Sequence, residues 1–282
     1  MIMEYNFKVR EVTESLINWI KVWFEHNGKN CNAVIGISGG KDSTIVGKLL
    51  VEALGKDRVI GVLLPNGEQH DKDVAERVCS YLGIKSYTWN IGGIFDQFMA
   101  TFRVSIGVRP SEQSQINLAP RLRMAALRMV AQSFNGRFVN TSNLSEDWVG
   151  YATVDGDAAG DMSPLSMLTV QEVKAIGHHL GIPRHFVEKI PEDGLVGKSD
   201  EDNLGVSYLA IDRYIRGYDN DLLAPEEVQI IEKKFAANKF KLTGTSGMPK
   251  FVPLPEDLYD NVDKDWIKSF KCYGEDPRMK NY

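Results

Sequence analysis

The chain has 282 residues, of which 43% are hydrophobic and 25% are charged, and its formal net charge at pH 7 is −5. This length and composition predict a globular protein with a large core, and the acidic balance argues against a nucleic-acid partner. No apolar run approaches the ~18 residues that cross a membrane, the N-terminus is polar, and three cysteines lack metal-binding spacing, so we expect a cytoplasmic protein.

Helices and strands alternate along the first half of the chain, and this alternation sets the fold class. In chain order the pattern predicts a helix over 8–25, a strand over 33–38, a helix over 43–54, a strand over 58–65, a helix over 71–83, a strand over 85–91, a helix over 117–134 and a strand over 136–142. The first two strands are continuous apolar runs, which is typical of strands buried on both faces. We therefore expect an α/β fold: a doubly wound parallel sheet with helices on both faces.

The later part of the chain is predicted to be helical. Amphipathic spacing predicts helices over 169–180, 203–216 and 225–237, and no strand is expected after residue 200. No internal repeat divides the chain, so we expect a single domain over residues 1–250. The Pro-spaced residues 251–282, rich in Asp and Lys, are expected to form a C-terminal extension on the surface.

The segment SGGKDS at residues 38–43 directly follows the first predicted strand and precedes a helix. Ligands of a parallel sheet bind at this carboxyl end of the strands. Gly39 and Gly40 let a ligand approach the backbone, and the helix N-terminus favours an anion such as phosphate. Lys41 adds a cation, and Asp42 adds a carboxylate, which is a usual ligand of Mg²⁺ beside bound phosphates. The segment therefore predicts a site for phosphates and magnesium.

Three alternatives compete with this interpretation. A Walker A loop fails, because only three residues separate the first glycine from Gly-Lys and Asp42 follows the lysine. The sequence of residues 36–40 satisfies the G-x-S-x-G nucleophile elbow, which would make Ser38 the nucleophile of an α/β-hydrolase with Asp161 and His185. An elbow directly after the first strand is atypical, and it leaves Lys41 without a role. The third alternative is a glycine turn without chemistry.

Several segments resemble known enzymes. SGGKDS resembles the SGGxDS pyrophosphate loop of the ATP pyrophosphatases, which adenylate a carboxyl or carbonyl oxygen and release pyrophosphate. Four further segments are similar to ammonia-dependent NAD synthetases: LLPNGEQHDKD at 63–73, NLAPRLRM at 117–124, NTSNLSEDWVGYATVDGDAAGDMSPL at 140–165 and DGLVGKSDEDNLGVSY at 193–208. The matches follow the family order over about residues 30–215. The resemblance implies the Rossmann-like fold of the ATP pyrophosphatases.

The resemblance also implies an activity, a ligase that makes NAD from deamido-NAD, ATP and ammonia. The carboxylate of deamido-NAD attacks the α-phosphorus of ATP, pyrophosphate leaves, and ammonia then displaces AMP. Family members are homodimers, and Mg²⁺ accompanies ATP. The main alternative is another SGGxDS enzyme that acts on a different carboxylate. A hydrolase that uses Ser38 and a catalytically silent nucleotide-binding module are the remaining alternatives.

The resemblance assigns roles to individual residues. The ATP-binding residues that it implies are Gly36, Ile37, Ser38, Gly39, Gly40, Lys41, Asp42, Ser43, Leu64, Thr141 and Ser199, with adenine against the backbone of 62–64. Lys41 and Asp42 are expected to be catalytic, and Asp42 and Glu146 to hold Mg²⁺ from two sides of the phosphates. The residues expected to bind the dinucleotide are Arg121, Asp157 and Lys241.

Some positions depart from the family pattern. Val154 and Val170 stand where lysines are usual, and Phe240 stands where a histidine is usual. These departures concern the substrate contacts and leave the adenylation centre unchanged. Residues 191–204 are expected to form a mobile lid over the nucleotide. Nitrogen is expected from free ammonia or a separate amidotransferase subunit, because no cysteine is placed as an amidase nucleophile.

Overall fold

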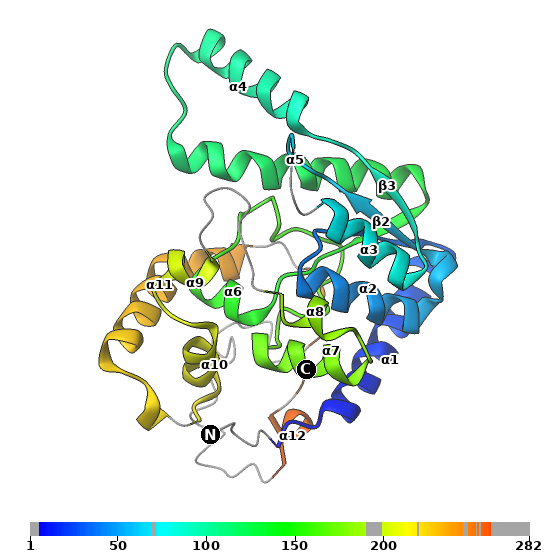
Figure 1. Ribbon diagram of the computed structural model, residues 1–282, viewed down its shortest axis with the longest axis vertical. Coiled ribbons are helices and arrows are strands. Elements are labelled where there is room, and N and C mark those ends of the chain that lie inside the picture. Colours follow the sequence, from blue (N-terminus) through cyan, green and yellow to red (C-terminus); the bar gives the residue numbers. More distant parts are fainter. Residues whose placement is uncertain are drawn as a thin grey trace.

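The computed structural model of the protein describes residues 6–68, 72–189, 199–218, 220–244, 248–251, 253 and 255–260. The fold contains a four-stranded parallel sheet with the strand order β3-β2-β1-β4. Figure 1 shows β2 and β3 of this sheet beside α3 and α5. The strands are β1 (Asn32–Gly36), β2 (Val59–Leu63), β3 (Lys85–Thr88) and β4 (Gly136–Val139). The parallel pairings confirm the predicted α/β class. The strands β2, β3 and β4 lie within predicted ones, and β1 begins one residue before its predicted start.

Helices connect the strands and continue after them. They are α1 (Val9–Gly28), α2 (Lys41–Leu54), α3 (Lys72–Leu82), α4 (Gly92–Ile106), α5 (Glu112–Ser133), α6 (Leu144–Val149), α7 (Val170–His179), α8 (Arg184–Val187), α9 (Asp200–Leu204), α10 (Tyr208–Arg216), α11 (Pro225–Gly244) and α12 (Pro255–Leu258). Two 3-10 turns lie at Lys56–Arg58 and Asn220–Leu222. The described parts of the predicted helices are present, with ends that shift by a few residues and an α11 that extends further, with one exception. The single helix predicted over 203–216 is divided into α9 and α10, because Gly205 ends the first and Ser207 caps the second.

Side chains of the strands alternate between two apolar clusters, one on each face of the sheet. Ala33 and Ile35 of β1 belong to the cluster formed with α1, α2, α3 and α7, whereas Val34 belongs to the cluster formed with α5. Successive side chains of a strand point to opposite faces, so a strand that is covered on both faces must be apolar throughout. This explains the continuous apolar runs and confirms that helices cover both faces.

Helix α4 was not predicted from the sequence. It packs on α5 and projects from the rest of the molecule at the top of Figure 1. Its large apolar side chains include Phe98, Val104 and Ile106, which are 54%, 87% and 60% exposed. Its residues Ile94, Phe95, Phe98, Met99 and Phe102 recur at the spacing of one helix face, so the signal for this helix is present in the sequence although no helix was predicted there. Helix α5 also starts earlier than expected, and Ser111 caps it ahead of Pro120.

Described residues after position 250 are packed into the core, which differs from the expected surface extension. Phe251, Leu258 and Tyr259 are buried in the cluster that contains α1 and α7. Phe7 and Tyr259 form an antiparallel bridge, and α12 contacts α1. Prolines and charged residues obscured these few apolar positions in the sequence. The domain boundary at residue 250 stays a prediction, and residues 261–282 lie outside the described part.

A third apolar cluster joins α6, α10 and α11 beside the sheet. Trp148 of α6 stacks on Phe235 of α11, with ring centroids 4.5 Å apart. Leu144 of α6 and Ile211 of α10 are fully buried in the same cluster. Because α6 follows β4 after only four residues, this cluster fixes a short helix at the carboxyl end of the sheet.

A buried ion pair links α7 to α10. Arg216 donates two hydrogen bonds of 2.7 Å to the carboxylate of Glu172 and one of 2.8 Å to the carbonyl of Met167. The hydroxyl of Tyr259 also donates to Glu172. The side chains of Arg216 and Glu172 are 1% and 0% exposed. Burial by itself raises the pKa of Glu172, but the Arg216 charge outweighs this effect and lowers that pKa below its usual value.

Asp212 is a second buried carboxyl group, and it makes the stability depend on pH. It accepts hydrogen bonds from the hydroxyl of Ser145 at 2.5 Å and from the amide of Gln171 at 2.8 Å. Burial raises its pKa to about 7, against the effect of both hydrogen bonds. A folded-state pKa above the unfolded value means that protonation of Asp212 stabilises the fold. This contribution is complete below the unfolded pKa and is lost as the pH rises through about 7.

The isosteric substitution Asp212→Asn tests this dependence. Relative to the variant, the wild type is expected to lose about 1.4 kcal/mol of unfolding free energy per pH unit between pH 5 and 7, and nothing further above that range. Urea unfolding of both proteins from pH 5 to 8 measures the difference. Two parallel stability curves would show that Asp212 keeps its ordinary pKa in the fold.

The cysteines and helices of the described residues can be compared with the expectations from composition. Cys31 and Cys79 are free and buried, as expected of small apolar side chains, and Cys272 lies outside the described residues. In the part of the chain that the structure describes, no helix has the length and apolar character needed to cross a membrane.

Candidate active site

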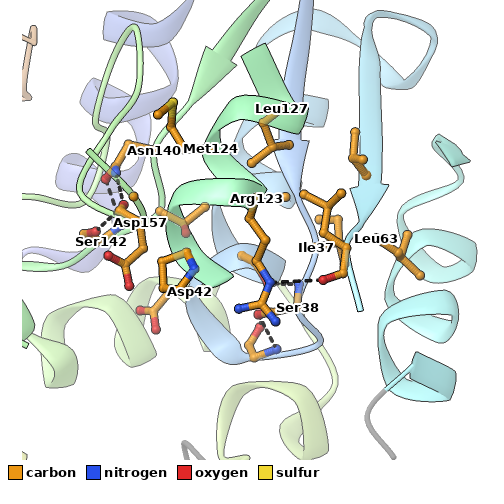
Figure 2. Close-up of a pocket in the computed structure, with 18 of the residues that line it drawn as sticks. Ile37, Ser38, Asp42, Leu63, Arg123, Met124, Leu127, Asn140, Ser142 and Asp157 are labelled. Carbon is orange, nitrogen blue, oxygen red and sulfur yellow. Dashed lines mark hydrogen bonds between the residues drawn. The ribbon is translucent and has the colours of Figure 1, made fainter. Parts of the chain in front are cut away.

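A cavity of about 590 Å³ lies at the carboxyl ends of β1, β2 and β4, where the sequence predicted a ligand site (Figure 2). The β1–α2 loop, the residues after β2, one face of α5 and the segments after β4 form its walls. The predicted site residues that line it are Gly36, Ile37, Ser38, Gly40, Asp42, Ser43, Leu64, Thr141, Glu146 and Asp157. The predicted site residues outside its lining are Gly39, Lys41, Arg121, Ser199 and Lys241.

The β1–α2 loop is held by its own side chains. The hydroxyl of Ser38 lies 3.2 Å from the amide of Gly40 and 3.2 Å from the hydroxyl of Ser43. The hydroxyl of Thr44 donates to the carbonyl of Gly40 at 2.8 Å, in the first turn of α2. The loop therefore presents the N-terminus of a 14-residue helix to the cavity, which favours a bound anion.

The residues of the alternative hydrolase triad have separate partners. Ser38 bonds within its loop, whereas Asp161 pairs with Arg128 and accepts the amide of Phe138 at 2.8 Å. The ring of His185 packs on Phe186, with centroids 4.2 Å apart. The geometry thus gives Ser38 no general base from this set.

Gly39 is the position in the loop where a side chain is excluded. Its φ is +83°, and an added Cβ would lie 3.1 Å from the amide nitrogen of Ala75. We expect Gly39→Ala to weaken ATP binding by about tenfold, because strain of roughly 1–2 kcal/mol displaces the loop. Isothermal titration with ATP measures the effect. Gly55→Ala is the matched control, since Gly55 has the same φ of +83° and open space around it. Equal ATP affinities in both variants would contradict the prediction.

Two carboxylates and one ammonium group meet at the loop. The ammonium of Lys41 lies 2.8 Å from Asp42 Oδ2 and 3.8 Å from Glu146 Oε1. Burial and the Asp42 carboxylate raise the pKa of Glu146 to about 8, although Lys41 opposes the shift. Burial alone lowers the pKa of Lys41, but both carboxylates outweigh it and raise the pKa above its usual value. Asp42 and Glu146 therefore form a compact acidic pair, and the ammonium of Lys41 lies beside it as a cation.

The placement of Lys41 differs from the one that the sequence suggested. We expected its ammonium to face the phosphates of ATP, yet the side chain is 2% exposed and turns behind the two carboxylates. The ammonium also lies over the ring of Tyr208, 5.7 Å from its centroid. The sequence motif could not show this, because the partner residues Glu146 and Tyr208 come from α6 and α10. A direct contact between Lys41 and phosphate stays a prediction.

The donor set fits magnesium when phosphates are bound. Asp42 and Glu146 line the cavity and supply carboxylate oxygens, which are the ligands that Mg²⁺ prefers. Among the described residues, no group of three or more His, Cys, Asp or Glu side chains is arranged to hold a metal ion by itself. Two carboxylates would therefore need phosphate oxygens and water to complete an octahedral shell.

One wall of the cavity is apolar and was only partly predicted. The expected wall after β2 contributes Leu64, while α5 adds Arg123, Met124 and Leu127 (Figure 2). Arg123 donates to the carbonyl of Leu64 at 3.0 Å, which joins the two walls. Together with Pro120, the α5 residues have the i, i+3, i+4, i+7 spacing of one helix face. That spacing is the signal in the sequence that could have identified them.

The sequence model of the NAD synthase family matches residues 12–245, which include all of the cavity walls. The chain belongs to the NAD synthase family. Its relatives include the NH(3)-dependent NAD(+) synthetases of Methanocaldococcus jannaschii, 36% identical over 77% of this chain and 86% of that protein, and of Pyrococcus furiosus, 36% identical over 88% and 96%. The solved structure of NMN synthetase from Francisella tularensis has a TM-score of 0.76 and 29% identity, and the match covers 83% of this chain and 96% of that one.

Membership in the NAD synthase family confirms the resemblance found in the sequence. It supports the interpretation as a ligase of NAD synthesis over the hydrolase that would use Ser38. The resemblance assigned roles to residues by their positions in the sequence motifs. The structure adds the location of each of these side chains that lies in the described part of the chain.

The predicted dinucleotide contacts of this NAD synthase family member lie at one end of the cavity and beyond it. Asp157 lines the cavity, and burial raises the pKa of its carboxyl group. Arg121 is exposed and donates to the carbonyl of Val154 at 3.2 Å. Lys241 donates to the carbonyl of Gly150 at 2.7 Å. A common substrate contact for these three residues stays a prediction.

The remaining predicted contacts border residues outside the described part. Ser199 caps α9, and its hydroxyl lies 2.7 Å from Asp202 Oδ2. Residues 190–198, which include most of the expected lid, are not among the described residues. The roles of Ser199 in ATP binding and of the lid stay predictions.

Proposed function

We propose that the protein makes NAD from deamido-NAD, ATP and ammonia, as the names of its curated relatives suggest. The main support from the structure is that Asp42 and Glu146 meet at a helix N-terminus inside a cavity whose other wall is apolar. One end of this cavity suits the phosphates of ATP, and the wall formed by Leu64 and Leu127 suits adenine.

The chain's own residues would act mainly by positioning the reactants. The amides of the first turn of α2 and the hydroxyl of Ser43 would hold the phosphates, and Asp42 and Glu146 would hold Mg²⁺. The metal would neutralise charge on the phosphates as pyrophosphate leaves. Lys41 would keep the two carboxylates together. Holding the two substrates in line accounts for much of the rate in such a reaction, and a dry apolar wall strengthens the electrostatic contribution.

Pyrophosphate release tests this function directly. The purified protein is mixed with ATP, Mg²⁺ and deamido-NAD, with ammonium chloride or glutamine as the nitrogen source. We expect pyrophosphate, AMP and NAD in equal amounts with ammonium and only background NAD with glutamine. Because NH₃ rather than NH₄⁺ carries the reacting lone pair, the rate at fixed total ammonium should rise with pH while NH₃ is limiting. Equal rates with glutamine would contradict the proposed nitrogen source.

A mononucleotide substrate is the second candidate. The Francisella tularensis neighbour is an NMN synthetase, so the carboxylate precursor of NMN belongs in the same assay. This chain also carries Val154, Val170 and Phe240 where the resemblance implies contacts to the dinucleotide. Competition between the two carboxylate substrates at equal concentrations decides between them. A higher kcat/KM for the mononucleotide would replace deamido-NAD as the proposed substrate.

We also propose that the protein forms a homodimer in the cytoplasm. Exposed apolar side chains on α4 and the start of α5 support an interface there, and they include Ile94, Phe98, Val104, Ile106 and Ile116. Several exposed apolar side chains on two packed helices are typical of a protein interface. Analytical ultracentrifugation measures the mass in solution, and a monomer at micromolar concentration would contradict the proposal.

A further inference from the structure

Asn143 links the two acidic residues of the candidate metal site, through the carboxylate of Asp42 and the backbone amide of Glu146. It is fully buried and forms the N-cap of α6, where its side-chain oxygen accepts the amide of Glu146 at 3.1 Å. Its side-chain nitrogen donates to Asp42 Oδ1 at 3.2 Å. Asp42 belongs to α2 and Glu146 to α6. The side-chain amide of Asn143 therefore connects these two helices, and Asn143 and Asp42 are 101 residues apart in the sequence.

The orientation of the Asn143 amide follows from its two partners. The amide of Glu146 is a donor, and the carboxylate of Asp42 is an acceptor. A flipped Asn143 side chain would place its NH₂ group against an N–H and its oxygen against a carboxylate, which removes both hydrogen bonds. The side chain therefore fits its surroundings in only one orientation.

Each carboxylate depends on this contact in a different way. The two oxygens of Asp42 have separate partners, with Lys41 at Oδ2 and Asn143 at Oδ1, so the plane of the carboxylate is fixed. Glu146 lies in the first turn of a helix of only six residues, and Asn143 caps that turn. Because a short helix has few internal hydrogen bonds, its cap is a large share of what sets the position of Glu146.

We propose that Asn143 is a positioning residue that fixes the separation and orientation of Asp42 and Glu146, so that both reach one divalent cation. The inference rests on the proposed function, in which these carboxylates hold Mg²⁺. Magnesium requires near-octahedral oxygen ligands at about 2.0–2.1 Å, so a small displacement of either carboxylate weakens binding. Asn143 itself contacts neither the metal nor the substrates in this assignment.

Substitution by serine separates the two contacts of Asn143. Serine is a good N-cap, so Asn143→Ser keeps the bond to the amide of Glu146, but its side chain is too short to reach Asp42. Asn143→Ala removes both contacts. The matched control is Ser111→Ala, which removes the N-cap of α5 at the amide of Ser114, on a different helix from either carboxylate.

The probe is Mn²⁺, titrated in the presence of a non-hydrolysable ATP analogue and followed by the electron paramagnetic resonance of the free ion. Asn143→Ser is expected to bind Mn²⁺ about tenfold more weakly than the wild type, with an almost unchanged melting temperature. Its Mg²⁺ concentration for half-maximal activity should rise by a similar factor. Asn143→Ala should also melt at a lower temperature, whereas Ser111→Ala should lose some stability and keep wild-type Mn²⁺ affinity.

Two outcomes would overturn the assignment of Asn143. Wild-type Mn²⁺ affinity in Asn143→Ser would show that the residue only caps α6. Equal weakening in Ser111→Ala would show that lost stability, and not positioning, weakens the metal. Asp42→Asn separates this failure from that of the proposed function. If Asp42→Asn also binds Mn²⁺ normally, the metal site is elsewhere; if it alone loses Mn²⁺, only the role of Asn143 is wrong.

Discussion

Asp42→Asn and Glu146→Gln are each expected to lower the rate of NAD formation by about a thousandfold or more, while the fold is kept. Both substitutions keep the size of the side chain and remove one anionic ligand of Mg²⁺, whose neutralisation of charge in the transition state is worth several kcal/mol. Glu146→Gln should fold well, because the raised pKa of about 8 already favours an uncharged Glu146 in the free protein at neutral pH.

The rates are measured as pyrophosphate release at saturating ATP over a wide range of Mg²⁺. Circular dichroism and melting temperature confirm the fold of each variant. Glu52→Gln is the control, because Glu52 also lies on α2 but pairs with Lys48 at 2.5 Å away from the cavity lining. A near-wild-type rate in either cavity variant at saturating Mg²⁺ would remove that residue from the metal site.

Arg216→Met is expected to destabilise the protein by about 3–5 kcal/mol, which is the largest effect on stability that we predict. The substitution leaves the carboxylate of Glu172 fully buried beside Tyr259 and without its cation. The pKa of Glu172 is lowered in the fold, so the pair stabilises above the unfolded pKa of this group, and the contribution is lost as the pH falls through the folded value. Urea unfolding at pH 7 measures the loss.

The double variant Arg216→Met, Glu172→Gln is the control for this prediction. It removes the buried charge together with its partner, so we expect it to recover a large part of the lost stability. If the single variant is no less stable than the double variant, the stranded carboxylate is not the cause of the loss. Neither Arg216 nor Glu172 lines the cavity, so the loss of stability can be measured apart from any change at the candidate active site.

The sheet and the phosphate loop were predictable because their signals are local. The central strands β1 and β2 are buried and therefore read as apolar runs, whereas β3 lies at an edge of the sheet with mostly exposed side chains. The loop residues from Ser38 to Ser43 are consecutive. The direction of a side chain, in contrast, depends on residues that are distant in the sequence. Lys41 turns inward because Glu146 and Tyr208, far along the chain, surround its ammonium group.

Two other features were not predicted, for different reasons. Helix α4 carries apolar residues at helical spacing from Ile94 to Phe102, so its signal was present in the sequence but was not assigned. Asn143 looked like an ordinary polar residue after a strand, and its importance appears only when α6 and α2 are side by side. Arg123 illustrates the intermediate case: the helical spacing was readable, but the choice between Arg121 and Arg123 required the position of the cavity.

The packing of α12 and Tyr259 against α1 has a consequence for biosynthesis. Lys8 at the start of the chain donates its amide to Leu258 at 2.9 Å, and Phe7 pairs with Tyr259. The ribosome makes Phe7 and Lys8 long before it makes Leu258 and Tyr259. Part of the apolar face of α1 therefore stays uncovered while almost the whole described chain is synthesised. Contacts this distant in sequence form slowly, and exposed apolar surface favours aggregation in the meantime. We therefore expect the nascent chain to need a chaperone until its last packed residues emerge.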